Sequence, residues 1–199
     1  LGDLHQAQGN YAEALKYFTD YNRLREELFA SNPQRESLKH GLAISYSKLG
    51  ELHQAQGNYA EALKYFADCN SLGEELYASN PQSEALKNGL AISYQNLGEL
   101  HQAQGNYAEA LKYFSDYNRL LEELYASNPQ SYDLYNGLAI SYAKLAEIYQ
   151  KSGKPVAEIR PWYEKALVIF TELYELAGLP EAKKYVELTE KRLDALGEG

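Results

Sequence analysis

Three histidines recur at one place in a repeated segment and are the first candidates for metal chemistry. His5, His53 and His101 follow one another at intervals of 48 residues. Neutral imidazole is a common metal ligand, but equivalent atoms of neighbouring helical units lie about 10 Å or more apart, which one ion cannot bridge. Tyr149 takes the same place in a fourth, degenerate segment. We therefore interpret all four as aromatic-sized packing positions and predict no metal site.

Adjacent glutamates are the candidates for acid–base chemistry, and they occur as Glu26-Glu27, Glu74-Glu75 and Glu122-Glu123. Neighbouring residues point about 100° apart on a helix, so the two carboxylates of a pair do not face one reacting group. We interpret these pairs as a solvated helix face. The sequence also shows no nucleophile elbow, phosphate-cradling loop or Cys/His cluster. It predicts that the chain is not an enzyme and takes no cofactor.

Cys69 and Gly73 are smaller than the residues at corresponding positions of the other segments. Those residues are Tyr21 and Arg25 in one segment, and Tyr117 and Leu121 in another. Positions four apart share one face of a helix. Two interpretations stay open at this point: Cys69 is a buried, inert thiol, or the two small residues leave a notch that accepts a ligand.

The composition narrows the class of protein. The 199 residues carry a net charge of −9, one cysteine, no methionine and 19 tyrosines. A hydrophobic fraction of 45% with 24% charged residues is typical of a folded chain. The acidic balance argues against nucleic acid as a partner, and no apolar run is long enough for a membrane span. A single cysteine excludes an internal disulfide and favours a reducing, cytoplasmic location.

Internal repetition dominates the chain. The 15-residue block Leu4–Phe18 recurs unchanged at 52–66 and 100–114. A fixed period of this size indicates an array in which each unit buries its apolar face against its neighbours. We expect a single repeat domain over 1–199. Its predicted parts are a partial first repeat at 1–34, a second repeat at 35–82, a third at 83–130, a degenerate fourth at 131–179, and a capping helix and tail at 180–199.

Each repeat reads as a hairpin of two helices of about 20 residues. Gly105 fits the end of the first helix. Asn128 is the expected N-cap of the next hairpin, with Pro129 at the first helical position. A glycine lies inside each first helix, at Gly41, Gly89 and Gly137. We favour a helix that continues through this glycine over a break between a lead-in helix and the main helix.

The residues around this hairpin resemble the tetratricopeptide repeat signature. In the third repeat they are Tyr94, Leu97, Gly98, His101, Gly105, Tyr107, Ala110 and Phe114. The ordinary repeat of that family has 34 residues, so 48 residues would lengthen each helix by about two turns. The resemblance implies an all-α fold: a right-handed superhelical solenoid of antiparallel helical hairpins, with a C-terminal capping helix.

Both ends of the chain depart from the regular pattern. Leu1 aligns with Leu49, so we expect the chain to be a fragment that starts midway through a first helix. In the fourth repeat, Pro161 predicts that the second helix starts late or kinks. After residues 178–180, an amphipathic segment predicts the capping helix, with one face for the stack and one for water.

In the family that this chain resembles, the first helices line a concave groove that binds a peptide or protein partner. Carried over position by position, the resemblance places these residues in the groove: Ser47, Lys48, Glu51, Gln54, Asn88, Gln95, Asn96, Glu99, Gln102, Asn136, Lys144, Glu147 and Gln150. Asp3, Glu51, Glu99 and Glu147 form a ladder of one carboxylate per repeat. The alternative is that these residues form an ordinary solvated helix face.

Charge and substitutions refine the expected partner. The net charge is 0 over residues 1–48, −4 over 49–96 and −3 over 97–144. An acidic groove favours a basic or polar segment over an acidic one. Glu84 and Lys87 are replaced by Tyr132 and Tyr135 in the next repeat. These two tyrosines either form an aromatic contact patch or pack against the capping end.

We therefore expect a scaffold for protein–protein interaction, the recognition or regulatory arm of a larger signalling protein. Its expected partner is a protein or peptide, with no nucleic acid, no membrane and no cofactor. The alternative is a structural spacer that self-associates through its N-terminal end, or an engineered, consensus-like array. The sequence does not name the partner.

Overall fold

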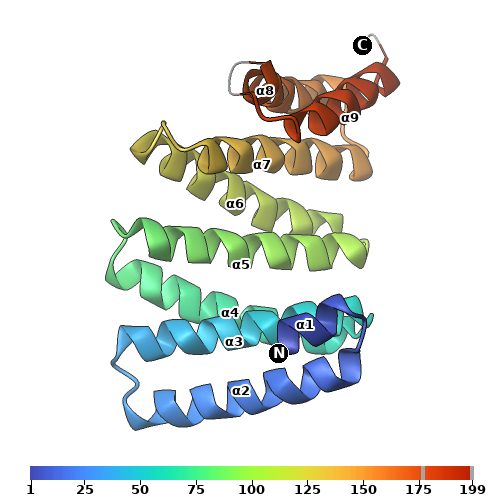
Figure 1. Cartoon of the computed structure of the whole chain (residues 1–199). Coiled ribbons are helices and arrows are strands. Elements are labelled where there is room, and N and C mark those ends of the chain that lie inside the picture. The colour runs from blue at the N-terminus through green and yellow to red at the C-terminus, as the bar shows by residue number, and fades with distance from the viewer. Residues whose placement is uncertain (176–177, 198–199) are drawn as a thin grey trace. The chain divides into compact units, whose positions relative to one another are not determined.

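A computed structural model describes residues 1–175 and 178–197 (Figure 1). In this part of the chain all regular structure is helical. The helices are α1 (Gly2–Ala7), α2 (Tyr11–Ser31), α3 (Glu36–Ala55), α4 (Tyr59–Ser79), α5 (Glu84–Ala103), α6 (Tyr107–Ser127), α7 (Tyr132–Lys151), α8 (Val156–Glu175) and α9 (Ala182–Ala195). The chain forms two compact units, Leu1–Gln104 and Gly105–Gly199. None of the helices described is long and apolar enough to cross a membrane.

The turn inside each hairpin is set by a glycine, as the sequence predicts. Gly57 and Gly105 both have φ of 75°, in the left-handed region that glycine adopts without steric cost. The amide of Asn58 then donates a hydrogen bond to the carbonyl of His53 at 2.8 Å. This tight return brings the two helices of a hairpin together, and α3 packs along α4.

The prediction for the turn between hairpins is wrong in one respect. Asn128 is the C-cap of α6 and not the N-cap of the next helix. The N-cap is Ser131, whose hydroxyl accepts a hydrogen bond from the amide of Leu134 at 3.3 Å. The carbonyl of Asn128 accepts from the amide of Ser131 at 3.1 Å, so Pro129 occupies a turn where its fixed φ is favourable.

In the first unit, α1 to α5 pack in chain order, each against the next (Figure 1). Phe18 lies in a cluster with Ala14, Leu49 and Leu52, all buried. Gly50 of α3 explains how closely the next helix approaches. A Cβ atom at Gly50 would lie 2.5 Å from the ring of Phe66, so the ring rests directly on the backbone of α3.

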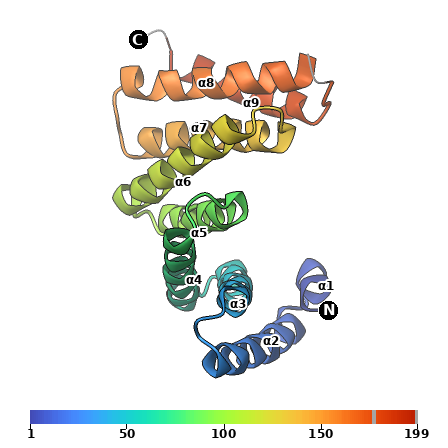
Figure 2. The same ribbon diagram turned by 90° about the vertical axis from the view of Figure 1, so that its left-hand side faces the viewer.

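In the second unit, α6 packs on α7, α7 on α8, and α8 on α9 (Figure 2). Helix α9 covers the apolar face of α8, as expected of a cap: Leu193 and Leu196 pack against the cluster of Ala146, Ile159 and Tyr163. Helix α8 does not start late, because it begins at Val156 and contains Pro161 within its span.

The first helices are continuous through their glycines, so the preferred interpretation is confirmed. Gly41 lies inside α3, Gly89 inside α5 and Gly137 inside α7. The surroundings of these glycines differ. A Cβ at Gly41 would meet the guanidinium of Arg25 at 2.7 Å, one at Gly137 would meet Leu121 at 3.7 Å, and one at Gly89 would meet nothing within 4 Å.

Candidate partner-binding face

The repeated histidines pack as flat rings, which confirms the aromatic interpretation. His5 stacks on Tyr17 and His53 stacks on Tyr65, each with ring centroids 5.5 Å apart. Their Nδ1 atoms are buried and make no hydrogen bond. Among residues 1–175 and 178–197, no group of three or more His, Cys, Asp or Glu side chains could hold a metal ion.

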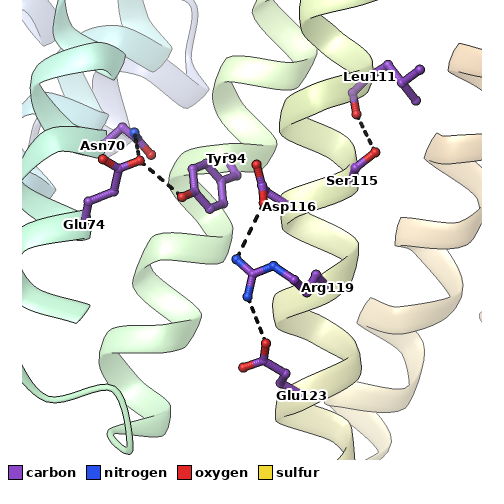
Figure 3. A network of polar contacts seen from close by, with 8 residues as sticks. All are labelled: Asn70, Glu74, Tyr94, Leu111, Ser115, Asp116, Arg119 and Glu123. Carbon is purple, nitrogen blue, oxygen red and sulfur yellow. Dashed lines mark hydrogen bonds and ion pairs between the residues drawn. The ribbon is translucent and has the colours of Figure 1, made fainter. Parts of the chain in front are cut away.

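The glutamate pairs lie at the surface, as predicted, and they also form contacts with neighbouring side chains. The first glutamate of each pair joins two helices: Glu74 accepts hydrogen bonds from Asn70 at 2.9 Å and from Tyr94 of α5 at 3.2 Å (Figure 3). Glu26 and Glu122 accept the same pair of bonds in their own repeats. The second glutamates form ion pairs, as Glu123 does with Arg119 at 2.8 Å (Figure 3).

Behind each of these glutamates lies a serine–asparagine contact, which is buried in two repeats and part-buried in the third. Ser45 donates to Asn22 at 2.8 Å, Ser93 to Asn70 at 2.8 Å and Ser141 to Asn118 at 2.7 Å. We call each chain of Ser, Asn, Glu and Tyr an interhelix latch. Each latch ties a second helix to the first helix of the next repeat. Periodicity alone did not reveal it, although the Asn, Glu, Ser and Tyr residues recur every 48 residues.

The expected groove residues of the first unit lie on α3 and α5. Asn96 donates to the hydroxyl of Ser47 at 3.3 Å, so the two helices touch at this face. Ser47 also donates to Glu51 at 3.0 Å, and Gln95 donates to Glu99 at 2.9 Å. The face keeps polar groups accessible: Gln54, Gln102 and the five residues above are half-buried, and Asn88 is exposed.

Lysine interrupts the expected carboxylate ladder. Lys48 forms an ion pair with Asp3 at 2.9 Å and a longer one with Glu51 at 3.8 Å. The hydrogen bond to Asp3 raises the pKa of Lys48 above its ordinary value, so the ammonium stays charged at neutral pH. Part of the negative charge on α1 and α3 is therefore compensated within the protein.

The corresponding residues of the second unit lie on α7. Asn136, Lys144 and Glu147 are half-buried and Gln150 is exposed. Glu147 pairs with Lys151 at 2.8 Å and with Arg192 of the capping helix at 3.4 Å. This carboxylate therefore ties α9 to α7 in addition to lying at an expected groove position. Lys144 lies over the ring of Phe114, with its Nζ 5.6 Å from the ring centre.

The two tyrosines of the expected aromatic patch have different environments. Tyr132 is 60% exposed. Tyr135 stacks on Tyr125 of α6, with ring centroids 4.7 Å apart, and donates a hydrogen bond to Glu172 of α8. Burial, together with this bond, raises the pKa of the Tyr135 hydroxyl. Tyr132 therefore remains available for contact, whereas Tyr135 packs within the second unit.

Cys69 and Gly73 border a cavity in the first unit. Its volume is about 260 Å³, and it lies among α3, α4 and α5. The thiol of Cys69 is buried, and burial raises its pKa to about 12, so the thiolate is not formed at neutral pH. Both interpretations of this position are thus partly right: the thiol is buried and unreactive, and a notch exists beside it.

Two exposed isoleucines beside the cavity escaped the sequence analysis. Ile44 of α3 is 42% exposed and Ile92 of α5 is 46% exposed, and both line the cavity. Ile92 lies at the surface because the face of α5 that carries it has no helix packed over it in the first unit.

The class of protein follows from this architecture: both units are built from antiparallel helical hairpins, so the chain is a helical repeat protein. The tetratricopeptide repeat family model matches residues 41–123. This part of the chain is therefore similar to tetratricopeptide repeats, with a long, 48-residue period. No curated protein sequence matches it significantly.

Several solved structures are similar to this chain to different degrees. BtubC (BKLC) from P. vanneervenii is similar with a TM-score of 0.65 at 20% identity, over 100% of this chain and 80% of that one. A tetratricopeptide repeat protein from Bacteroides fragilis NCTC 9343 matches with a TM-score of 0.35 at 15% identity, over 96% and 95% of the two chains. A de novo designed helical repeat protein matches with a TM-score of 0.37 at 12% identity, over 94% and 95%. At these identities the likeness to BtubC concerns the fold alone.

Proposed function

We propose that this chain is a protein–protein interaction module that holds a peptide segment of its partner against the first helices of its hairpins. The observation that carries the proposal is the face of α3 and α5, where Ser47 and Asn96 meet at 3.3 Å. Polar groups on this face are accessible, and Ile44 and Ile92 are exposed beside them. Helical repeat proteins generally use such extended surfaces for binding, and tetratricopeptide repeats are one family of this kind.

The charge of this face supports a basic or polar segment as the occupant. Residues 49–96 carry a net charge of −4. Glu51 and Glu99 lie at equivalent positions of α3 and α5, and Lys48 forms a long ion pair of 3.8 Å with Glu51. A cationic segment would approach faster and with fewer unfavourable contacts than an acidic one.

The test is selection from a phage-displayed library of random peptides, followed by fluorescence polarisation with the selected peptides. We expect peptides enriched in lysine and arginine, with an affinity that falls as salt is added. The double variant Glu51→Lys/Glu99→Lys should weaken binding by about tenfold or more at low salt.

A matched control separates the groove from net charge. Glu13→Lys/Glu61→Lys makes the same change of charge in the first turns of α2 and α4, away from the face of α3 and α5. We expect this control to change affinity by less than about twofold. Equal losses in both variants would contradict the location of the site, and a library that yields no binding peptide would contradict the function.

Self-association is the second candidate function, and exposed leucines on α2 favour it. Leu24 is 50% exposed and Leu28 is 48% exposed, four residues apart on one helix face. The corresponding Leu76 of α4 is only 3% exposed. Sedimentation velocity over about a hundredfold range of concentration tests this function. A mass that rises with concentration, and falls back in Leu24→Lys/Leu28→Lys, would support it, and a constant monomer mass would exclude it.

A further inference from the structure

The cavity beside Cys69 results from three small residues that meet at one place. Cys69 and Gly73 of α4 face Gly89 of α5 across it. A Cβ at Gly73 would lie 3.5 Å from Leu90, at ordinary contact distance, and one at Gly89 would have nothing within 4 Å. The space therefore comes from missing side chains and not from separated helices.

The corresponding positions of the other repeats show what fills such a space. In α2, the guanidinium of Arg25 lies over the ring of Tyr21, 4.9 Å from its centre, and reaches Gly41. In α6, Tyr117 and Leu121 are buried, and Leu121 lies against Gly137. The chain thus places a tyrosine ring and a second large side chain here in two repeats and leaves both out in the third.

The volume fits one bulky side chain. A cavity of about 150 Å³ is enough to bind benzene, and drug-sized ligands occupy about 300 Å³ or more. At about 260 Å³, this cavity lies between the two. Its walls are largely aliphatic, with contributions from Ala43, Leu76 and Leu90.

The groups beside the cavity indicate which residues would flank a bulky side chain bound in it. Ser47 and Cys69 both line the cavity, and Ser47 is hydrogen-bonded to the carboxylate of Glu51 at 3.0 Å. The charge of Glu51 also acts on the Cys69 thiol, so this carboxylate lies close to the cavity wall. His40 and Asn88 supply polar groups at the rim, and Ile44 and Ile92 supply exposed apolar surface. An apolar group flanked by cationic residues complements this arrangement.

We propose that this cavity is the anchor pocket of the binding face, and that its occupant is one bulky apolar side chain, tyrosine- or leucine-like, of a partner peptide with lysine or arginine beside it. This inference rests on the proposed function, because the peptide is the same segment. It adds two points: which part of the binding face contributes most to the affinity for the peptide, and what kind of peptide residue binds there. The pocket is a property of this chain, since it depends on Cys69 and Gly73.

The first experiment uses p-cresol, the side chain of tyrosine, as the probe, with acetamide as a polar control. Amide chemical shifts are followed by NMR during titration of the full chain. We expect saturable shifts from p-cresol at Gly73, Gly89 and their neighbours, and none from acetamide. The variant Cys69→Tyr/Gly73→Leu restores the side chains found in α6 and should abolish these shifts. Shifts that do not saturate, or that persist in the filled variant, would overturn the pocket.

A matched substitution controls for the general effect of replacing a residue by the equivalent residue of another repeat. Ser71→Arg also introduces the residue of the following repeat, but Ser71 is exposed and lies outside the cavity. It should leave p-cresol binding unchanged. If the filled variant were poorly folded, Gly73→Leu alone supplies a smaller change with the same expected direction, since ordinary contact space surrounds that position.

The second experiment uses the library-selected peptides. Replacing the apolar residue of a peptide by alanine should lower affinity for the natural chain by about tenfold and leave affinity for the filled variant unchanged. Equal affinity of an unaltered peptide for both proteins would overturn the anchor pocket while leaving the interaction function intact. Binding of p-cresol with no peptide selected would overturn the peptide as occupant together with the proposed function.

Discussion

At the scale of residues, one polar contact recurs between the second helix of a repeat and the first helix of the repeat that follows. In the second unit, Ser141 is fully buried and donates to Asn118, while Asn118 donates to Glu122 at 3.1 Å. Buried polar groups are costly when unpaired and specific in geometry when paired. The interhelix latch therefore selects one register between the helices, which apolar contacts alone specify less sharply.

The latch predicts measurable coupling between its members. Asn118→Ala should destabilise the chain by about 1–3 kcal/mol, because it removes a buried partner from Ser141 and leaves space behind. Ser141→Ala should destabilise the chain less, because it removes the hydrogen-bond donor and only the small volume of the hydroxyl group. A double-mutant cycle from urea unfolding should give a coupling of about 1 kcal/mol. A coupling near zero would show that the contact carries no specific energy.

The tyrosine at the surface end of the latch should make the stability of the fold depend on pH. Burial, followed by the charge of Glu26 and the hydrogen bond to it, raises the pKa of Tyr46 from 10.0 to about 12. The folded state then holds the phenol proton more tightly than the unfolded state. The stabilisation is complete below pH 10 and is lost as pH rises through 12.

The variant Tyr46→Phe tests this dependence, since phenylalanine has no proton to lose. Thermal unfolding is measured from pH 8 to 12 for both proteins. The melting temperature of the natural chain should fall more steeply above pH 10 than that of the variant. Parallel curves would contradict the assigned pKa shift.

At the scale of elements, glycines set how closely helices approach. The ring of Phe66 packs on the backbone at Gly50, and the ring of Phe18 packs on Gly2 in the same way. The fourth repeat has Ala146 in the corresponding place, fully buried against Tyr163. The Leu-Gly pair of the repeat signature therefore has a steric cause in this chain, namely room for an aromatic ring.

Two glycine substitutions in first helices should have opposite effects. Gly89→Ala should stabilise the chain by about 0.5–1 kcal/mol, because the helix interior gains propensity and nothing lies within 4 Å of the new methyl group. Gly50→Ala should destabilise it by about 1–3 kcal/mol, because the methyl group would lie 2.5 Å from Phe66. Denaturant midpoints of the two variants give the comparison, and a shared direction would contradict the steric argument.

At the scale of the whole molecule, the chain consists of two compact units, each with its own core. Repeat proteins gain stability mainly from contacts between neighbours, so a local defect need not spread along the chain. The acidic charge is uneven as well: the first 48 residues are neutral and the next 48 carry −4. Both the local stability and the net charge are therefore expected to differ from one segment of the chain to another.

Hydrogen exchange should reveal this segmentation. In Gly50→Ala, amides of α3 and α4 should exchange faster by about tenfold or more, since about 1.4 kcal/mol corresponds to a factor of ten. Amides of α7 and α8 should keep the protection of the natural chain. Equal acceleration in both units would show that the chain unfolds as one cooperative body.

The sequence by itself determined the elements of this protein. The helical period and the Gly-Asn turns are local signals, and they located helices of 20 and 21 residues between glycines of positive φ. The continuous first helices and the capping helix were predicted from the same kind of local signal, and the packing role of the histidines was predicted from their alignment with Tyr149. The N-cap assignment failed because Asn-Pro suits both a turn and a cap, and only the hydrogen bond from Ser131 distinguishes them.

The tertiary structure decided which residues the elements bring together. A repeat shows which positions are equivalent, but not that Ser93 reaches Asn70 or that Gly73 meets Gly89 across a cavity. Tyr132 and Tyr135 are three residues apart in sequence, yet Tyr132 is 60% exposed whereas Tyr135 stacks on Tyr125. These contacts join residues 10 to 23 positions apart on different helices, so they depend on how helices pack, which local periodicity does not encode.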